Sequence, residues 1–382
     1  MDFESLFDIP IDDLHTPCYL TDARLLQKNT ALLKQIQQRT GCKILLAQKA
    51  FSMFSAYPLI RDDLAGTTAS GLFEAKLGRE HFGKEVHVFS PAYTQEDFTQ
   101  LLELCDHIVF NSFGQWKKYR QQVQDATRNI SCGIRINPGY AEVETDLYNP
   151  CISGSRMGVP LEQMEDDFAG MDGIHFHTMC EQNSDVLERT LDHMLPQFDK
   201  WLKQCKWVNF GGGHHITRPD YDVERLVRCI ERVRDTYGVQ VYLEPGEAVA
   251  LNAGYLVATV LDVVHNGMDI AILDASAACH MPDVLEMPYR PHILYSGTAG
   301  EKAYTYRLAG NTCLAGDVIG DYSFDHQLQA GEKLVFCDMA IYSMVKNNTF
   351  NGVPLPDIAL YQNGHIDLVK RFGYADFEGR LS

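Results

Sequence analysis

Two lysines flank a short apolar stretch near the start of the chain, Lys43-Ile-Leu-Leu-Ala-Gln-Lys49. The apolar run is typical of a short buried strand, and Lys49 lies just past its end. Burial lowers the pKa of an amine, and a neutral amine can attack a carbonyl group. A lysine at a strand end more often extends its ammonium into solvent. The role of Lys49 therefore depends on what the other predicted strands carry at their ends.

Polar or glycine positions end every other predicted strand of this part of the chain. They are Ser70, Ser90, Asn111, Arg135, His177, the triplet Gly211-Gly212-Gly213, and Glu244. The carboxyl ends of the strands of a parallel barrel meet on one face, where active sites form. We therefore expect these residues to surround Lys49.

The glycine triplet Gly211–Gly213 directly follows a predicted strand. Consecutive glycines allow backbone amides to converge on an anion such as a phosphate, although a tight strand-to-helix turn would also explain them. Gly246, in Glu244-Pro-Gly-Glu247, provides a second close approach from the next strand. Two glycine loops on adjacent strands favour a phosphate site.

Three further strand ends suggest what this phosphate belongs to. Glu244 could keep a pyridine nitrogen protonated, and His177 could stack on the ring. Arg135 inside a barrel mouth needs an anionic partner. Alternatively, His175 and His177 could be two ligands of a metal site, or buried core residues. An amine, a phosphate cradle, a stacking imidazole and a carboxylate for a ring nitrogen together favour pyridoxal 5'-phosphate, with no metal.

The elements that position these residues alternate between strands and helices. Strands are predicted at residues 43–48, 65–69, 86–90, 107–111, 132–136, 173–177, 206–210 and 240–244, with helices between them, for example at 184–205 and 221–237. Eight such repeats predict an α/β fold with a closed (β/α)₈ barrel, also called a TIM barrel, over residues 22–252.

A second, all-β domain is predicted from residues 1–21 and 253–382. Its strand-like segments are 16–20, 255–264, 268–273, 303–308 and 333–336, joined by Gly, Pro and Asn turns. The predicted β-domain would complete the active site of the barrel.

Composition restricts the class of protein. The charge of −18 argues against nucleic acid or an anionic membrane as a partner and is compatible with a cationic substrate. Eleven cysteines without a CxxC pair favour reduced thiols in the cytoplasm. The N-terminal residues lack the features of a signal peptide, and no run reaches the length of a membrane span.

The sequence resembles the barrel-type pyridoxal-phosphate decarboxylases, the group of ornithine and diaminopimelate decarboxylases that shares its fold with alanine racemase. The matching motifs are Leu-Ala-Gln-Lys49-Ala, Ile-Arg135-Ile, Phe-His177, Gly-Gly-Gly213, Glu244-Pro-Gly246, Asn-Thr-Cys313 and Asp-Met-Ala-Ile-Tyr342. Within this group the chain resembles the carboxynorspermidine (carboxyspermidine) decarboxylases of polyamine biosynthesis. The stretches that support this are Ser-Gly-Leu-Phe-Glu74-Ala, Leu-Tyr-Asn-Pro-Cys151, Leu-Asp274-Ala-Ser-Ala-Ala-Cys-His280-Met-Pro-Asp283 and Tyr-Arg290-Pro.

The resemblance implies a role for each matching residue. Lys49 would bind the cofactor covalently, Glu244 would pair with its ring nitrogen and His177 would stack on the ring. The other cofactor-binding residues would be Arg135, Gly211, Gly212, Gly213, Gly246 and Tyr342, of which Gly213, Gly246 and Tyr342 hold the phosphate. Cys313 would enter from the other subunit of a homodimer and return a proton to the substrate.

Two departures from the wider group concern the substrate. Ornithine and diaminopimelate decarboxylases carry an arginine after Glu-Pro-Gly, where this chain has Glu247, and an acid after the cysteine, where it has Leu314. Glu247 could accept a substrate ammonium, and Asp283 and Glu286 are candidates for the missing acid, with a solvated loop as their ordinary role.

Four alternatives remain open from the sequence. They are a diaminopimelate decarboxylase, a decarboxylase of another basic amino acid, a barrel hydrolase using a metal at His175, His177 and His214 or His215, and an inactive homologue acting as a regulator. The acidic residues Glu247 and Asp283 argue against a substrate with a distal carboxylate, and a racemase would call for arginine in place of Glu244.

Overall fold

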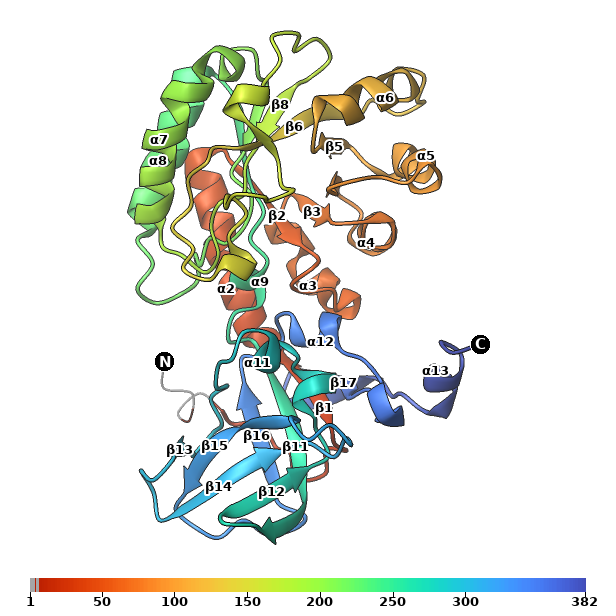
Figure 1. The fold of residues 1–382 in the computed structure, drawn as a ribbon, viewed down its shortest axis with the longest axis vertical. Coiled ribbons are helices and arrows are strands. Elements are labelled where there is room, and N and C mark those ends of the chain that lie inside the picture. The colour runs from red at the N-terminus through yellow and green to blue at the C-terminus, as the bar shows by residue number, and fades with distance from the viewer. Residues whose placement is uncertain (1–3, 5–6) are drawn as a thin grey trace. The chain divides into compact units, whose positions relative to one another are not determined.

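The computed structural model describes residue 4 and residues 7–382, and Figure 1 shows its elements. The predictions that concern residues 1–3, 5 and 6 lie outside the described part. The chain divides into two compact units, one of residues 27–249 and one of the described residues up to 26 together with 250–382. Each unit has its own sheet.

The first unit is a parallel barrel, as predicted. Its strands are β2 (Lys43–Ala47), β3 (Gly66–Ala69), β4 (Glu85–Phe89), β5 (His107–Phe110), β6 (Ser131–Asn137), β8 (Gly173–His175), β9 (Trp207–Asn209) and β10 (Gln240–Leu243). They are hydrogen-bonded in the order β5-β4-β3-β2-β10-β9-β8-β6, and β5 also pairs with β6, which closes the ring. The two-residue strand β7 (Val159–Pro160) pairs with β6 outside this ring.

Helices flank the barrel strands (Figure 1). They are α2 (Ala23–Thr40), α3 (Tyr57–Ile60), α4 (Leu72–Leu77), α5 (Gln95–Leu104), α6 (Phe113–Gln124), α7 (Ser184–Leu202), α8 (Val223–Tyr237) and α9 (Glu247–Ala250). Side chains cap three of the longer helices: Thr94 accepts from the amide of Asp97, Ser112 from Gln115 and Asp222 from Arg225. Strands buried along their length and helices with one buried face are what a packed barrel requires.

The second unit is a mixed sheet. It contains β1 (Cys18–Asp22), β11 (Gly254–His265), β12 (Asp269–Leu273), β13 (Gly297–Thr298), β14 (Tyr304–Ala309), β15 (Val318–Phe324), β16 (Lys333–Cys337), β17 (Asp357–Gln362) and β18 (His365–Lys370). The order is β13-β15-β14-β12-β11-β1-β17-β18, and β16 pairs with β11. Short helices connect the strands: α10 (Ala277–His280), α11 (Asp283–Glu286), α12 (Ser343–Lys346) and α13 (Tyr374–Glu378).

The N-terminal strand β1 joins this second sheet, as the sequence indicated. It lies between β11, to which it is antiparallel, and β17, to which it is parallel. Two buried clusters pack on the sheet, one containing Tyr322 and Phe336 and the other Leu20 and Tyr255. Among the described residues, no helix has the length and apolar character needed to cross a membrane.

Candidate active site

One cavity opens at the carboxyl end of the barrel strands. Its lining is Ala47, Lys49, Thr68, Ala69, Ser70, Phe89, Arg135, His175, His177 and Glu244. Five of the residues that the sequence placed at strand ends are therefore brought together: Lys49, Ser70, Arg135, His177 and Glu244. The ends of β2, β3, β4, β6, β8 and β10 build this site.

Lys49 lies two residues past the end of β2, in a turn. Its side chain is exposed to the cavity, whose walls partly desolvate the amine. This partial loss of hydration lowers the pKa of Lys49, and the positive charge of Arg135 lowers it further. Carboxylates at Glu244, Glu247 and Glu74 oppose the shift. The site therefore favours a neutral amine more than water does.

Glu244, just after β10, is ionised in the buried site. Its Oε2 atom is 3.1 Å from His175 Nε2, and its Oε1 atom accepts a 2.7 Å hydrogen bond from Asn209 Nδ2. Burial alone would favour the protonated acid, but the His175 ring and the amide of Asn209 lower the pKa of Glu244 to about 2. A fixed anion faces the cavity as a result.

His177 accepts a 3.0 Å hydrogen bond at Nδ1 from the amide of Gly212. An acceptor at Nδ1 leaves the proton of the neutral ring on Nε2. Burial and the charges of Lys49 and Arg135 keep the pKa of His177 well below its ordinary value. His177 is thus an uncharged ring fixed in one orientation beside the cavity.

The glycine triplet is required by packing against the chain that follows β8. A Cβ on Gly211 would lie 2.5 Å from the Phe176 carbonyl oxygen, and one on Gly213 would lie 2.0 Å from that of Met179. Both glycines also have positive φ, 68° and 81°, which suits glycine best. The tight turn that the sequence left open is therefore present, whatever the loop binds.

Backbone amides in this loop are nevertheless available to an anion. The amides of Gly211 and Gly212 donate to Asn209 Oδ1 and His177 Nδ1. Within residues 7–382, the amides of Gly213 and Gly246 have no acceptor. Two free amides on adjacent loops are the pattern of a phosphate cradle.

Arg135 is buried with 6% of its surface exposed. It donates a 3.3 Å hydrogen bond to the His177 carbonyl and lies over the Phe89 ring at 4.6 Å. In the described part of the chain it has no carboxylate partner, and its buried Nε donates to no acceptor. Burial lowers its pKa to about 10. A buried guanidinium with spare donors fits an anionic ligand.

Glu247, the first residue of α9, has a partner that the sequence did not indicate. Its Oε2 atom lies 3.3 Å from Nε2 of His215, and both side chains are about nine-tenths buried, with 12% and 10% exposed. Glu74, in α4, accepts from the amide of Ser70, and burial raises its pKa. Both carboxylates act electrostatically on Lys49.

Four other predicted site residues belong to the unit with the mixed sheet. Cys313 is exposed and its amide donates to Asn351. Tyr342 has φ of 57° and precedes α12. Asp283 and Glu286, the ends of α11, both bind the ammonium of Lys346, Glu286 at 2.6 Å.

Two of the polar residues predicted at strand ends do not line the cavity. Asn111 is not part of the cavity lining, since its side chain bonds to Arg156 and Gly158, and neither is Ser90. Asn209, which holds Glu244, was missed. The available signal was a buried asparagine as the last residue of a strand, because a buried amide needs partners.

A different polar cluster lies at the opposite, amino end of the barrel. Glu85, His87 and His107 form the only group of three potential metal ligands within 4.8 Å found among the described residues. The two rings are stacked, 3.9 Å apart and 8° from parallel, and the ammonium of Lys43 binds Glu85. Parallel stacked rings do not share a plane in which one ion could bind both. The cluster is a polar layer of the core.

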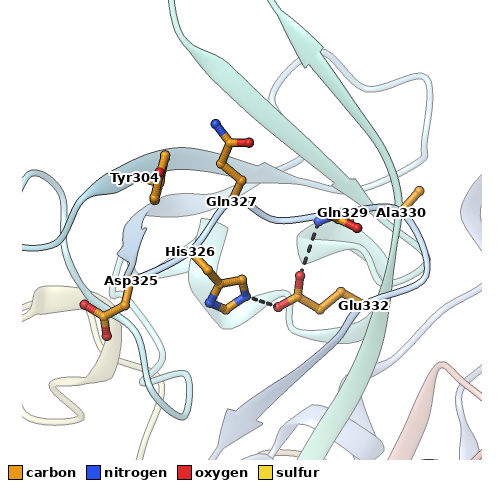
Figure 2. Close-up of a pocket in the computed structure, with 7 residues that line it drawn as sticks. All are labelled: Tyr304, Asp325, His326, Gln327, Gln329, Ala330 and Glu332. Atoms are coloured by element: carbon orange, nitrogen blue, oxygen red, sulfur yellow. Dashed lines mark hydrogen bonds and ion pairs between the residues drawn. The ribbon is translucent and has the colours of Figure 1, made fainter.

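Figure 2 shows a second hollow, on the mixed sheet. Tyr304, Asp325, His326, Gln327, Gln329, Ala330 and Glu332 line it. Glu332 is already engaged, by His326 Nε2 at 2.5 Å and by the amide of Gln329 at 3.2 Å. Asp325 pairs with Lys302. These are contacts of a polar surface turn, with no group placed for chemistry.

Comparisons with known proteins agree with this site. A family model described as pyridoxal-dependent decarboxylase, C-terminal sheet domain, matches residues 18–340. A carboxynorspermidine/carboxyspermidine decarboxylase of Campylobacter jejuni is 42% identical over 97% of this chain and 99% of its own. A carboxyaminopropylagmatine decarboxylase of Synechocystis is also 42% identical, over 97% of this chain and 96% of its own. The crystal structure of carboxynorspermidine decarboxylase from Campylobacter jejuni, complexed with norspermidine, has a TM-score of 0.89 and 41% identity, covering 96% of this chain and 100% of that one.

Proposed function

The chain belongs to the pyridoxal-dependent decarboxylases, and we propose that it decarboxylates carboxynorspermidine, carboxyspermidine or both, releasing norspermidine or spermidine. One observation carries the reaction class. A single cavity holds Lys49, whose pKa is lowered, and Glu244, whose pKa is about 2. Two relatives named for these substrates, 42% and 34% identical over nearly the full length, support the substrate class.

Pyridoxal 5'-phosphate fits the residues present. The free amides of Gly213 and Gly246 suit its phosphate, and the spare donors of Arg135 suit an anionic group. When bound, the cofactor withdraws electrons from the substrate α-carbon so that the carboxylate can leave as carbon dioxide. The neutral ring of His177, held by the Gly212 amide, would lie flat against the cofactor. We assign Tyr342 to the phosphate on resemblance, together with Gly211 and Gly212 as loop residues.

Glu244 and Lys49 have complementary roles in this proposal. Glu244 would bind the protonated ring nitrogen, and His175 and Asn209 keep its carboxylate ionised for this purpose. Lys49, with its lowered pKa, supplies an amine that can hold the cofactor covalently and later release the product. The cavity thus provides an electron sink and a nucleophile.

Cys313 is the proposed proton donor to the carbon that has lost carbon dioxide. We infer that the protein is a homodimer in which Cys313 of one copy serves the barrel of the other. Its exposure supports a role at a surface that a second copy covers.

The eleven cysteines are all free thiols, which supports the proposal of a cytoplasmic protein.

Asp283 and Glu286 are proposed to bind the distal ammonium of the substrate. Both already bind one ammonium, that of Lys346, which demonstrates the chemistry that they can offer. Glu247 was the third candidate for an ammonium. Its pairing with His215 suggests a different use.

Carbon dioxide release from a panel of substrates tests the proposal. Carboxynorspermidine, carboxyspermidine, carboxyaminopropylagmatine, diaminopimelate and ornithine should be compared by kcat/KM at one pH. We expect the first two to lead, with carboxyaminopropylagmatine the second candidate, because one relative of 42% identity is named for it. Equal or better turnover of diaminopimelate would refute a pocket built for distal ammonium groups.

A further inference from the structure

The Glu247 carboxylate lies next to the proposed phosphate cradle. It follows Gly246 directly, and the amides of Gly246 and Gly213 have no acceptor among the described residues. The hydroxyl of Thr217, in the loop after β9, donates to the Ala248 carbonyl of α9 at 2.7 Å, which ties the two loops together. A lone carboxylate in this position would repel a phosphate group.

His215 changes the charge at this position. Its Nε2 atom lies 3.3 Å from Oε2 of Glu247. Burial lowers the pKa of His215, and Arg218 acts in the same direction. The negative charges of Glu247 and Glu181 outweigh both effects, so the pKa of His215 is raised. The ring therefore holds its proton to higher pH than an ordinary histidine does. The pair of Glu247 and protonated His215 is neutral as a whole.

The protonated ring has a second donor that the chain leaves unused. His215 is buried with 8% exposed, and within residues 7–382 neither ring nitrogen makes a hydrogen bond; Nε2 faces Glu247 as an ion pair, whereas Nδ1 faces no such partner. A protonated imidazole donates from both nitrogens. A buried charged donor without an acceptor is unfavourable unless a ligand supplies one.

We propose that His215, paired with Glu247, is the cationic residue of the cofactor phosphate site. This inference depends on the proposed function, because it presumes that pyridoxal 5'-phosphate binds in the barrel. Glu247 then serves the phosphate indirectly, by holding the charge of His215, instead of binding a substrate ammonium. The other charged or titratable groups facing the pair are Glu181 and Arg218 beside His215, and Lys49 and Cys180 beside Glu247.

The inference requires phosphate affinity to depend on pH. His215 has a raised pKa, so its charge is present at low pH and lost as the pH rises through that value. Phosphate keeps its second negative charge above about pH 6, so a loss of affinity at higher pH would come from the protein. The covalent bond to Lys49 also depends on pH, but pyridoxal, which lacks the phosphate, makes the same bond.

The ratio of the affinities for pyridoxal 5'-phosphate and pyridoxal therefore isolates the phosphate contribution. It is measured by titrating the apoprotein with each compound, following absorbance, between about pH 6.5 and pH 9. We expect the wild-type ratio to fall with pH. His215→Gln should lower the ratio about tenfold at the acidic end and remove the pH dependence, since a charge-assisted hydrogen bond is lost.

Two further variants make the test specific. In the double variant His215→Gln, Glu247→Gln the ratio should recover part of its value, because the uncompensated carboxylate is gone. The matched control is His214→Gln, since His214 is an adjacent buried histidine whose pKa burial lowers to about 4. That control should keep the wild-type ratio and its pH dependence.

Each outcome decides the inference. An unchanged ratio in His215→Gln, or a double variant that binds no better than the single one, would overturn it. If His215→Gln does not fold, as judged by far-ultraviolet circular dichroism, Glu247→Gln alone should still move the pH midpoint of the ratio downward, and no movement would overturn the inference. A wild-type protein that binds no pyridoxal 5'-phosphate would instead refute the proposed function.

Discussion

Nε2 of His175 lies 3.1 Å from a carboxylate oxygen of Glu244, inside the barrel. Asn209 binds the other oxygen at 2.7 Å. The anion is therefore formed and oriented by the protein itself, before any cationic ring nitrogen approaches. Such preorganisation means that binding need not first ionise or rotate the carboxylate.

Replacement of this carboxylate should affect catalysis more than cofactor binding. Glu244→Gln keeps the size of the side chain but removes the charge that would stabilise the protonated ring nitrogen. We expect kcat to fall by on the order of 100-fold, while the visible absorbance of the bound cofactor remains. Steady-state kinetics and absorbance of the same preparation check this, and an unchanged kcat would contradict the role of Glu244.

The same carboxylate should make stability depend on pH. Its pKa falls from 4.5 to about 2 on folding, so the stabilisation is fully present above pH 4.5 and is lost as the pH falls toward 2. The difference in unfolding free energy between the wild type and Glu244→Gln should shrink over that range, by on the order of 3 kcal/mol. Urea unfolding of the apoproteins measures it. The exposed Glu103→Gln is the control, and a difference that grows on acidification would be the wrong sign.

Two lysines near the two ends of β2 should respond oppositely to substitution. Lys49→Ala should abolish activity and the visible band that borohydride removes from the wild type, because the covalent attachment is lost. Lys43→Ala should retain both, since Lys43 binds Glu85 and Tyr242 at the amino end of the barrel. If only Lys43→Ala lost the band, the cofactor would be attached to Lys43 and the assignment of Lys49 would be wrong.

Mixing two inactive variants tests the shared site. If Cys313 acts on the barrel of the second copy, a heterodimer of Lys49→Ala and Cys313→Ala chains contains one intact site. An equal mixture that exchanges subunits should then recover about 25% of wild-type activity, because half of the dimers carry one of two sites. Each variant unmixed is the control. No recovery, with exchange verified by native mass spectrometry, would place Cys313 and Lys49 of the same chain in one site.

Substitutions around α11 test how the substrate is recognised. Asp283→Asn should raise KM for carboxynorspermidine about tenfold with a smaller change in kcat, since an ion pair to the distal ammonium is lost. Lys346→Met should lower KM, because the ammonium that now binds Asp283 and Glu286 would no longer compete. If Asp283→Asn leaves KM unchanged, α11 does not bind substrate.

The barrel and half of its site could be predicted because the relevant residues follow apolar strands. Arg135 lies near the carboxyl end of β6 and Glu244 directly follows β10, both strands have buried interiors, and parallel strands bring their carboxyl ends together. The role of Asn209 could not be predicted, because an asparagine after Trp-Val is typical of an ordinary strand end. Its partners, Glu244 and the Gly211 amide, become apparent only when β9 and β10 pair.

The missed strands of the mixed sheet have a similar cause. β15 contains Gly320 and Asp321, which are poor strand formers, yet pairing with β14 on one side and β13 on the other holds it in place. β18 is mostly exposed, and its only alternating apolar residues, Ile366 and Leu368, make a pattern too short to indicate a strand. The pairing of Glu247 with His215 could not be predicted from the sequence either, because it joins the first residue of α9 to a residue of the loop after β9.

The packing of the glycine loop has a consequence for genetic data on this protein. Any side chain at Gly211 or Gly213 would overlap a backbone carbonyl of the segment after β8. In a saturation mutagenesis library, variants at both codons will therefore be depleted through misfolding. This depletion will appear both in cells that need the enzyme's activity and in an assay that reports only the abundance of the protein. Depletion that appears only under selection for activity will instead pick out positions such as Lys49, whose side chain no neighbour requires for packing.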